Sequence, residues 1–450
     1  MNLFTRSDTI LNDSGFVPIG LICLGNQLIR NGYTTEIIDT QQIHEHKIQE
    51  FIKAKIVGLN YNFFTTELLE KTAAIAKDRG ATVIVGGQAA TPCAVQLLKG
   101  NSHIDYVIKY AGEESLLRLV EFIYEGNGDI KEIPNLVYRD NNKIVINREK
   151  QIDDAVFAPP SRLLPGLDMK WYIHNFYAFG YPELNETKYR VTNTFSHKGC
   201  PRRNSDSGCS FCARIDKQVQ MRSPIQVYSE YRYLQKEYGI NYIFDDSDSW
   251  IRPGFLRGLL DCYHEYGDLG IKLRVYGDIR DIRPSTIEYM KQLHVESILI
   301  GIESGSERIL ERNHKPMKKE EILRALTILA ENDIKVCASY ILGLIDEDEE
   351  TLNETLQIAK EIEEFGNLQT NYWNMITPLP GSSIWHEMMQ IPYLSEKYMD
   401  EYKFNVDELR SDYINHFCRL GNDGYGYLNS VLENVLTEMD APDGVREYMR

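Results

Sequence analysis

The chain has a deficit of positive charge and no long apolar run. Of its 450 residues, 49 are Lys or Arg and 66 are Asp or Glu, so the formal net charge is 49 − 66 = −17. Such acidity disfavours broad binding to nucleic-acid phosphates or anionic lipid. No apolar stretch approaches membrane-spanning length, and no charged segment followed by an apolar one opens the chain. We therefore expect a cytoplasmic protein that binds neither nucleic acid nor membrane.

Cysteine is also scarce, and most of it is scattered. Five of the eight cysteines lie singly in apolar stretches, at positions 23, 93, 262, 337 and 418, and we expect them to be reduced, buried small side chains. The other three, Cys200, Cys209 and Cys212, fall close together. A disulfide among them would leave one thiol over, and nothing indicates an oxidising compartment.

Two metal sites fit three neighbouring thiols. With His197 they could bind one zinc ion in a tetrahedral site. They could also bind an iron–sulfur cluster, because a loop rich in Gly, Pro, Ser and Asn lets backbone amides face the cluster sulfides. Three thiolates on four irons would leave one iron open for another ligand. Spacing alone does not separate these alternatives.

The first 150 residues alternate between strand-like and helical patterns. Strands are expected at 35–38, 55–59, 81–85 and 104–108, and helices at 18–32, 66–79, 92–99 and 113–124. Strict alternation predicts a doubly wound parallel sheet, whose ligands bind beyond the carboxyl ends of the strands. The candidate residues at those ends are Asn60, Tyr61, Gly86, Gly87, Gly112 and Glu113. Glycines that only make tight strand-to-helix turns are the alternative, and the dinucleotide pattern G-x-G-x-x-G is absent.

A second alternation follows a proline-rich linker. Residues 133–148 read as a hairpin, and prolines 159, 160 and 165 mark the linker over 151–188. Strands are then expected at 190–195, 241–244, 272–276, 297–300, 335–342 and 371–376, with helices at 224–238, 253–266, 284–293, 319–332 and 347–365. This pattern predicts a partial (β/α)6 barrel over 189–389, with its site at the carboxyl ends of the strands. Residues 390–450 read as a helical C-terminal region.

The cysteine loop follows the first of these strands and carries a family motif. Cys209-Ser210-Phe211-Cys212 resembles the C-x3-C-x2-C cluster motif of radical S-adenosylmethionine (SAM) enzymes, although eight residues replace the first three. The insert, 202–208, is a candidate for substrate or partner contact. Five later segments resemble that family in the same order, each at an expected strand end: 244–248, 277–280, 301–308, 340–344 and 377–382.

The resemblance implies a site made by residues of several strands. Cys200, Cys209 and Cys212 would bind a 4Fe–4S cluster, and Asp246, Ser247 and Asp248 the amino group of SAM. Arg280 would suit the SAM carboxylate. Phe211, Glu303, Ser304 and Gly343 would lie beside the cofactor. Ile345-Asp346 replaces the family's usual Pro-Gly after the fifth strand.

The first domain resembles the cobalamin-binding domains fused to radical SAM enzymes. The matching segments are PIGLICLGNQLIRNGYTTEIID, VGLN, VIVGGQAAT and YAGEESLL. As is general in those domains, the cobalt-ligating motif D-x-H-x-x-G is absent. The resemblance implies that Asn60, Tyr61, Gly86, Gly87, Gly112 and Glu113 bind the corrin and its nucleotide tail.

The implied activity is that of a cobalamin-dependent radical SAM enzyme. It would methylate an unactivated carbon of a small molecule or short peptide, through a 5′-deoxyadenosyl radical and methylcobalamin, with electrons from a donor such as flavodoxin or ferredoxin. A rearrangement, a ring contraction or another hydrogen abstraction without methyl transfer is an alternative. A non-catalytic cobalamin- or zinc-binding sensor is another. A methylthiotransferase is disfavoured, because Cys23 and Cys93 cannot supply a second three-thiolate cluster.

Overall fold

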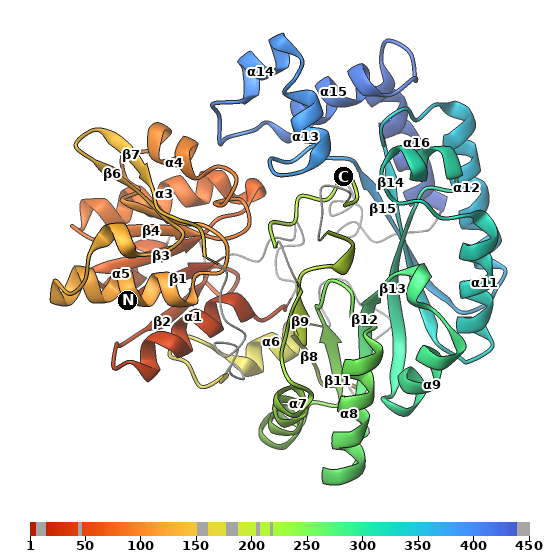
Figure 1. Cartoon of the computed structure of the whole chain (residues 1–450), viewed down its shortest axis with the longest axis horizontal. Coiled ribbons are helices and arrows are strands. Elements are labelled where there is room, and N and C mark those ends of the chain that lie inside the picture. The colour runs from red at the N-terminus through yellow and green to blue at the C-terminus, as the bar shows by residue number, and fades with distance from the viewer. Residues whose placement is uncertain are drawn as a thin grey trace. The chain divides into compact units, whose positions relative to one another are not determined.

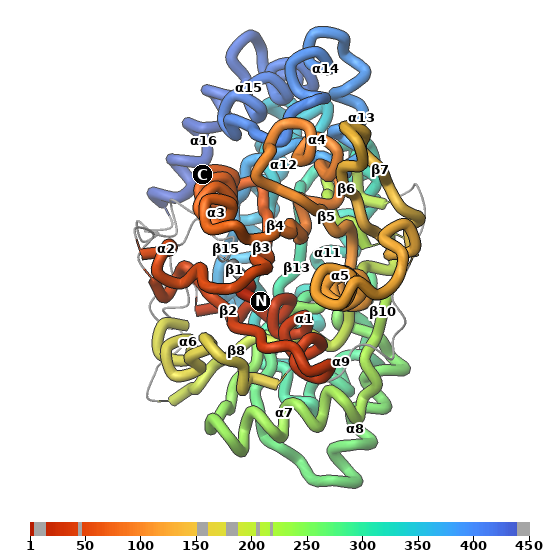
Figure 2. The backbone as a smooth tube through the Cα atoms, turned by 90° about the vertical axis from the view of Figure 1, so that its left-hand side faces the viewer, coloured from red at the N-terminus to blue at the C-terminus, as the bar shows by residue number. Residues whose placement is uncertain are grey.

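The chain folds as two α/β units. The computed structural model describes residues 1–5, 15–43, 47–150, 161–176, 188–203, 208–216 and 219–438. One unit contains Met1–Phe179 and Ser395–Phe404, and the other contains Gly180–Leu394 and Asn405–Arg450 (Figures 1 and 2). Among the helices described, none has both the length and the apolar character needed to cross a membrane.

The first unit is built on a seven-stranded sheet. The strand order is β2-β1-β3-β4-β5-β6-β7, in which β1 to β5 are parallel and the hairpin β6–β7 is antiparallel. The strands are β1 (Asn2–Thr5), β2 (Glu36–Asp39), β3 (Ile56–Asn60), β4 (Thr82–Gly86), β5 (Tyr106–Ile108), β6 (Leu136–Asp140) and β7 (Lys143–Ile146). The predicted doubly wound sheet is therefore confirmed.

Helices connect the parallel strands of this sheet. They are α1 (Ile19–Arg30), α2 (Ile48–Phe51), α3 (Thr66–Asp78), α4 (Ala94–Gly100) and α5 (Glu113–Glu125), and α6 (Met169–Asn175) follows the hairpin. Helix α1 buries Ile22 and Leu28 on one side, as its helical spacing predicts. Helices α1 and α5 contact each other, and α2 contacts α3.

Strand β1 is not predicted from the sequence, although it lies inside the sheet between β2 and β3. Its four residues, Asn-Leu-Phe-Thr, are too few to show a period. Tertiary contacts fix it instead. The Asn2 side chain donates to Glu36 (3.0 Å) and accepts from the backbone amides of Lys53 (3.2 Å) and Ala54 (2.9 Å).

A segment from the far end of the sequence completes the first unit. Within Ser395–Phe404, Tyr402 donates from its hydroxyl to Glu70, and its carbonyl accepts from the Tyr61 hydroxyl at 2.6 Å. Its ring lies where a Cβ on Gly100 would stand. Lys403 forms an ion pair with Glu70 at 2.5 Å. The helical region predicted for 390–450 is thus shared between the two units.

The second unit is an open, all-parallel sheet of six strands. Their order is β15-β14-β13-β12-β11-β8, which follows the sequence order of the strands in reverse. They are β8 (Val191–Thr194), β11 (Tyr242–Asp245), β12 (Lys272–Gly277), β13 (Val295–Glu303), β14 (Lys335–Leu342) and β15 (Leu368–Met375); β9 (His197–Lys198) and β10 (Gln220–Met221) form a separate ribbon. Successive parallel neighbours joined by helices make the predicted partial barrel.

The connecting helices lie along the outer side of this curved sheet (Figure 1). They are α7 (Pro224–Tyr238), α8 (Pro253–Tyr266), α9 (Pro284–Gln292), α10 (Glu307–Arg312), α11 (Lys319–Ala330) and α12 (Glu349–Glu363). Prolines 224, 253 and 284 each begin a helix, where the missing amide hydrogen is not needed. After β15 come α13 (Ser383–Met388), α14 (Pro392–Tyr398), α15 (Val406–Phe417) and α16 (Gly424–Glu438).

The contacts of Tyr402 predict that Ser395–Phe404 stabilises the sheet of the first unit. Tyr402 is 5% exposed, so Tyr402→Ala should leave a cavity and lower the free energy of unfolding by about 3 kcal/mol. Tyr393→Ala removes a ring that is 57% exposed and should cost less than about 0.5 kcal/mol. Urea denaturation measures both, and hydrogen exchange should accelerate in β3 and α4 only in the Tyr402 variant. Equal effects of the two substitutions would contradict this role.

Candidate metal and cofactor site

Three free thiols lie just beyond the carboxyl end of β8. Cys200 precedes the short helix η5 (Pro201–Arg203), and the Cys212 amide donates to the Cys209 carbonyl at 3.1 Å. All three cysteines are partly buried. Burial raises the pKa of Cys200, and raises that of Cys209 to about 11, and Cys212 acts electrostatically on both. The structure therefore brings the three predicted ligands into one neighbourhood.

The charges around the thiols bear on which metal group they could hold. Across the described ranges, no three His, Cys, Asp or Glu side chains converge closely enough to hold one metal ion. His197 is buried, and its Nε2 lies 2.5 Å from the Ser249 carbonyl oxygen. The cations of Lys315 and Arg280 favour the thiolate form of Cys209. Three thiols near cationic groups suit a negatively charged iron–sulfur cluster with one open iron.

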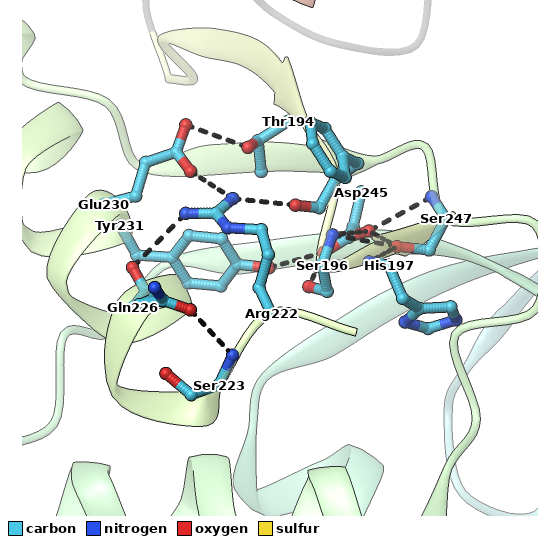
Figure 3. A network of polar contacts seen from close by, with 11 residues as sticks. Thr194, Ser196, His197, Arg222, Ser223, Gln226, Glu230, Tyr231, Asp245 and Ser247 are labelled. Carbon is cyan, nitrogen blue, oxygen red and sulfur yellow. Dashed lines mark hydrogen bonds and ion pairs between the residues drawn. The ribbon is translucent and has the colours of Figure 1, made fainter. Parts of the chain in front are cut away.

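A buried carboxylate fixes the start of the cysteine loop (Figure 3). Asp245 ends β11 and has no exposed surface. It accepts from the amides of Ser196 and Ser247 at 3.1 Å each, from both of their hydroxyls, and from Tyr231 at 2.9 Å. The Ser247 hydroxyl also accepts from the amides of Ser196 (2.9 Å) and His197 (3.0 Å). The ends of β8 and β11 are thereby joined around one carboxylate.

A buried ion pair between Arg222 and Glu230 also supports the end of β8. Arg222 donates to Glu230 at 2.5 Å and to the Phe195 carbonyl at 2.8 Å, and Thr194 donates to the other Glu230 oxygen at 2.9 Å. Both side chains of the ion pair are almost fully shielded from solvent (Figure 3). Helix α7, which carries Glu230, is therefore fixed to the end of β8.

The second half of the cysteine loop is held by Asn313. The Ser210 amide donates to the Asn313 carbonyl (3.0 Å), and the Ser210 hydroxyl donates to the Asn313 side chain (2.9 Å). The amide group of Asn313 donates in turn to the carbonyls of Ile309 (2.9 Å) and Ile345 (3.3 Å). Ser210 and Asn313 have no exposed surface, so this contact fixes the peptide between Cys209 and Cys212. Phe211, within the same turn, is partly buried.

The three residues predicted to bind the amino group of SAM have different contacts. Ser247 and Asp248 hold the cysteine loop: Asp248 accepts from the Gly199 amide at 2.7 Å and pairs with Arg214 at 2.8 Å. Asp246 instead accepts from the Asn193 side chain at 2.9 Å, and burial raises its pKa to about 7. Asp246 is thus the member of this set whose carboxyl would gain most from a cationic ligand.

Arg280 lies in a cluster of charges after β12. Its guanidinium binds Asp278 through two hydrogen bonds of 2.8 and 2.7 Å, and Arg202 binds the same carboxylate at 2.9 Å. These contacts, together with the charge of Lys315, outweigh burial and hold the pKa of Asp278 far below its usual range. Arg280 is close enough to Cys209 for each to shift the pKa of the other.

Glu303 is paired with Lys315, a residue that was not predicted. Lys315 donates to Glu303 and to the Gly301 carbonyl, each at 2.7 Å. Burial lowers the pKa of Lys315, but Glu303, Cys209 and Asp278 outweigh it, and the pKa is raised. A Cβ on Gly301 would collide with both side chains of the pair. Lys315 lies in none of the sequence motifs, so its role becomes visible only in the fold.

The remaining barrel candidates take different positions. Ser304 is fully buried and its hydroxyl lies 3.0 Å from that of Thr355 on α12, so it faces a helix. Gly343 has a φ of +90° and donates its amide to Glu347 at 2.6 Å. The substituted turn keeps a glycine-like conformation, since Asp346 has a φ of +65°. Ion pairs to Arg312 (3.2 Å) and Arg419 (2.9 Å) hold it there.

In the first unit, the predicted loops meet at one edge of the sheet. Asn60 and Gly86 are register partners at the ends of β3 and β4. Gly87 has a φ of +109°, and a Cβ there would strike Asn60 and the backbone of Tyr61. The Tyr61 side chain is fully buried, and its hydroxyl donates to the Tyr402 carbonyl. Gly112 immediately precedes α5, and the side chain of the next residue, Glu113, is buried.

Part of the chain is similar to a known protein family. Residues 195–359 match the sequence model of the Radical SAM superfamily. The chain is also 26% identical over 389 residues to the anaerobic magnesium-protoporphyrin IX monomethyl ester cyclase of Rubrivivax gelatinosus, a match that covers 82% of this chain and 66% of the cyclase. The chain thus spans about two thirds of the length of that relative.

Two solved proteins share the fold. TsrM of Kitasatospora setae, a radical SAM methyltransferase solved with cobalamin and a 4Fe–4S cluster, has a TM-score of 0.72 at 15% identity, covering 86% of this chain and 74% of TsrM. OxsB, a cobalamin-dependent radical SAM enzyme solved with aqua-cobalamin and SAM, has a TM-score of 0.63 at 14% identity, covering 99% and 63%. These findings confirm the predicted architecture and the resemblance to radical SAM enzymes.

Glu347, beneath the Gly343 turn, predicts a pH-dependent stability. Burial raises its pKa to about 8 from an ordinary 4.5. Between these values the unfolded chain loses the proton while the folded chain keeps it, so this group's stabilising contribution falls as pH rises. Glu347→Gln should flatten the dependence between pH 4.5 and 8, because glutamine carries no titrating proton.

Urea unfolding at pH 5, 6.5 and 8 measures this slope. The matched control is Glu350→Gln, at an exposed position in the first turn of α12, which should keep the wild-type slope. An unchanged slope in Glu347→Gln would show that Glu347 does not titrate in this range.

Proposed function

We propose that this chain, whose residues 195–359 belong to the radical SAM superfamily, is a cobalamin-dependent radical SAM enzyme. Its most favoured reaction is methylation of an unactivated carbon in a small molecule or short peptide. The observation that carries this proposal is the loop with Cys200, Cys209 and Cys212, fixed at the carboxyl edge of a parallel barrel by Asp245 and Asn313.

Each cofactor has candidate residues. The three cysteines would hold the 4Fe–4S cluster, Asp246 would receive the SAM ammonium group, and Arg280 would receive its carboxylate. Asn60, Gly86, Gly87 and Gly112 would contact cobalamin. When bound, the cluster, SAM and methylcobalamin would supply a 5′-deoxyadenosyl radical and a methyl group, with the electron delivered by a flavodoxin- or ferredoxin-like protein.

The side chains of the site would bind the cofactors and orient them. An ammonium group beside Asp246 would favour its ionised form and so offset the burial that raises its pKa to about 7. Asp278 holds Arg280 in a fixed orientation through two hydrogen bonds. Lys315 neutralises Glu303 beside Cys209, so the charge around the thiolates does not become more negative.

A reaction without methyl transfer is the second candidate. The cyclase of Rubrivivax gelatinosus aligns with 82% of this chain, and its name describes ring formation. A chain that uses the same cofactors for hydrogen abstraction alone would need the same cysteine loop, so the products must distinguish the two.

Anaerobic reconstitution with iron and sulfide tests the proposal. The wild-type protein should bind about four irons, cleave SAM to 5′-deoxyadenosine, and carry corrin absorbance after incubation with cobalamin. Replacing Cys200, Cys209 or Cys212 by Ala should abolish SAM cleavage. The control is Cys262→Ala, which removes a buried thiol on α8 and should retain SAM cleavage.

Isotope-labelled SAM decides between the two reactions. With candidate substrate pools, a labelled methyl group in the product supports methylation, and 5′-deoxyadenosine together with a changed but unlabelled product supports the second candidate. A wild-type protein that binds no iron, or one that cleaves SAM after loss of all three thiols, would contradict both.

A further inference from the structure

Arg203 lies between the first and second cysteines and turns back toward the third. It belongs to η5, and its guanidinium is partly buried. Nη1 donates to the Cys212 sulfur at 3.2 Å, and Nη2 donates to the Gly381 carbonyl oxygen at 3.3 Å. Arg203 belongs to the first part of the insert, and these two contacts fix its position. Residues 204–207 of the insert lie outside the described ranges.

Both partners of Arg203 are held by other contacts. Cys212 is fixed by the hydrogen bond that its amide donates to the Cys209 carbonyl and by the Ser210–Asn313 pair. Gly381 belongs to the loop after β15, whose next residues return to the cysteine loop: the Ile384 amide donates to the Ser210 carbonyl at 3.1 Å. The guanidinium therefore bridges the side-chain sulfur of one anchored segment and the backbone carbonyl of another, a geometry that suits its planar, forked donors.

Its neighbours among the arginines differ in their partners. Arg202 binds Asp278 and Asp281, and Arg214 binds Asp248. These cations form ion pairs with carboxylates, whereas Arg203 donates a hydrogen bond to a sulfur atom. A cationic N–H donor stabilises negative charge on sulfur more than a neutral donor does.

We infer that Arg203 is a positioning residue that raises the reduction potential of a cluster held by Cys200, Cys209 and Cys212. The inference rests on the proposed function. A cluster held here would accept one electron from the external donor, and part of the added charge would reside on the thiolates. Arg203 would stabilise that state by its hydrogen bond and its charge, without forming a covalent bond or transferring a proton.

The test is a potentiometric titration of the anaerobically reconstituted full chain, followed by electron paramagnetic resonance. In Arg203→Gln the ratio of reduced to oxidised cluster at the wild-type midpoint should fall roughly fivefold, a shift of about 40 mV toward lower potential for one electron. Arg203→Lys keeps the charge but lacks the forked donors of the guanidinium. Its midpoint potential should lie between those of the wild type and Arg203→Gln. Arg257→Gln, on the outer helix α8, makes the same change of charge and should match the wild type.

The outcomes separate the two proposals. A wild-type protein that binds no cluster contradicts the proposed function. A wild-type cluster with an unchanged or higher midpoint in Arg203→Gln overturns the role of Arg203 alone. If Arg203→Gln fails to retain iron, Arg203→Lys decides: a lower midpoint supports the inference, and a wild-type midpoint overturns it.

Discussion

The carboxylate of Asp245 is the contact on which the candidate site depends. It lies at the end of β11 with no exposed surface and accepts five hydrogen bonds from Ser196, Ser247 and Tyr231. An ionised carboxyl group only accepts hydrogen bonds and offers about four lone-pair sites, so five donors fill its accepting capacity. A buried charge without such partners would be strongly unfavourable. The chain after β8 must therefore turn at Ser196, and this turn directs Cys200 to the carboxyl edge of the barrel.

A second layer of buried polar contacts makes that turn rigid. The Arg222–Glu230 pair connects α7 to the carbonyl of Phe195, and removing one partner of such a pair costs about 3–5 kcal/mol. Asn313 performs the same task for the other half of the loop through Ser210. The same buried groups therefore stabilise the second unit and determine where the thiols lie.

The sequence predicts most of the fold because its signals are local. Prolines at helix starts and alternating strand patterns place α7, α8 and α9 and the six barrel strands within a few residues. The signals fail where distant contacts decide. Strand β1 is too short to show a period, and Ser395–Phe404 packs on the first unit through Tyr402, whose partner Glu70 is distant in the sequence.

The candidate site is predicted in outline, and the roles of its residues are not. Motif order brings Cys200, Cys209, Cys212 and Arg280 together, but it cannot show which way a side chain points. Ser304 therefore faces α12, Ser247 and Asp248 hold a loop, and Lys315 goes unnoticed because its partner Glu303 lies on another element. Asp346 shows the same limit: its positive φ is sustained by two arginines that the local sequence does not reveal.

Iron binding by Asp245→Asn tests most directly whether one buried carboxylate organises a cluster-binding loop. The substitution keeps the shape of the side chain but removes its charge and gives it a donor that faces other donors. After anaerobic reconstitution and desalting, a variant that still unfolds cooperatively should retain far less iron than the wild type and lack its iron–thiolate absorption. Wild-type iron content with an unchanged spectrum would contradict the account.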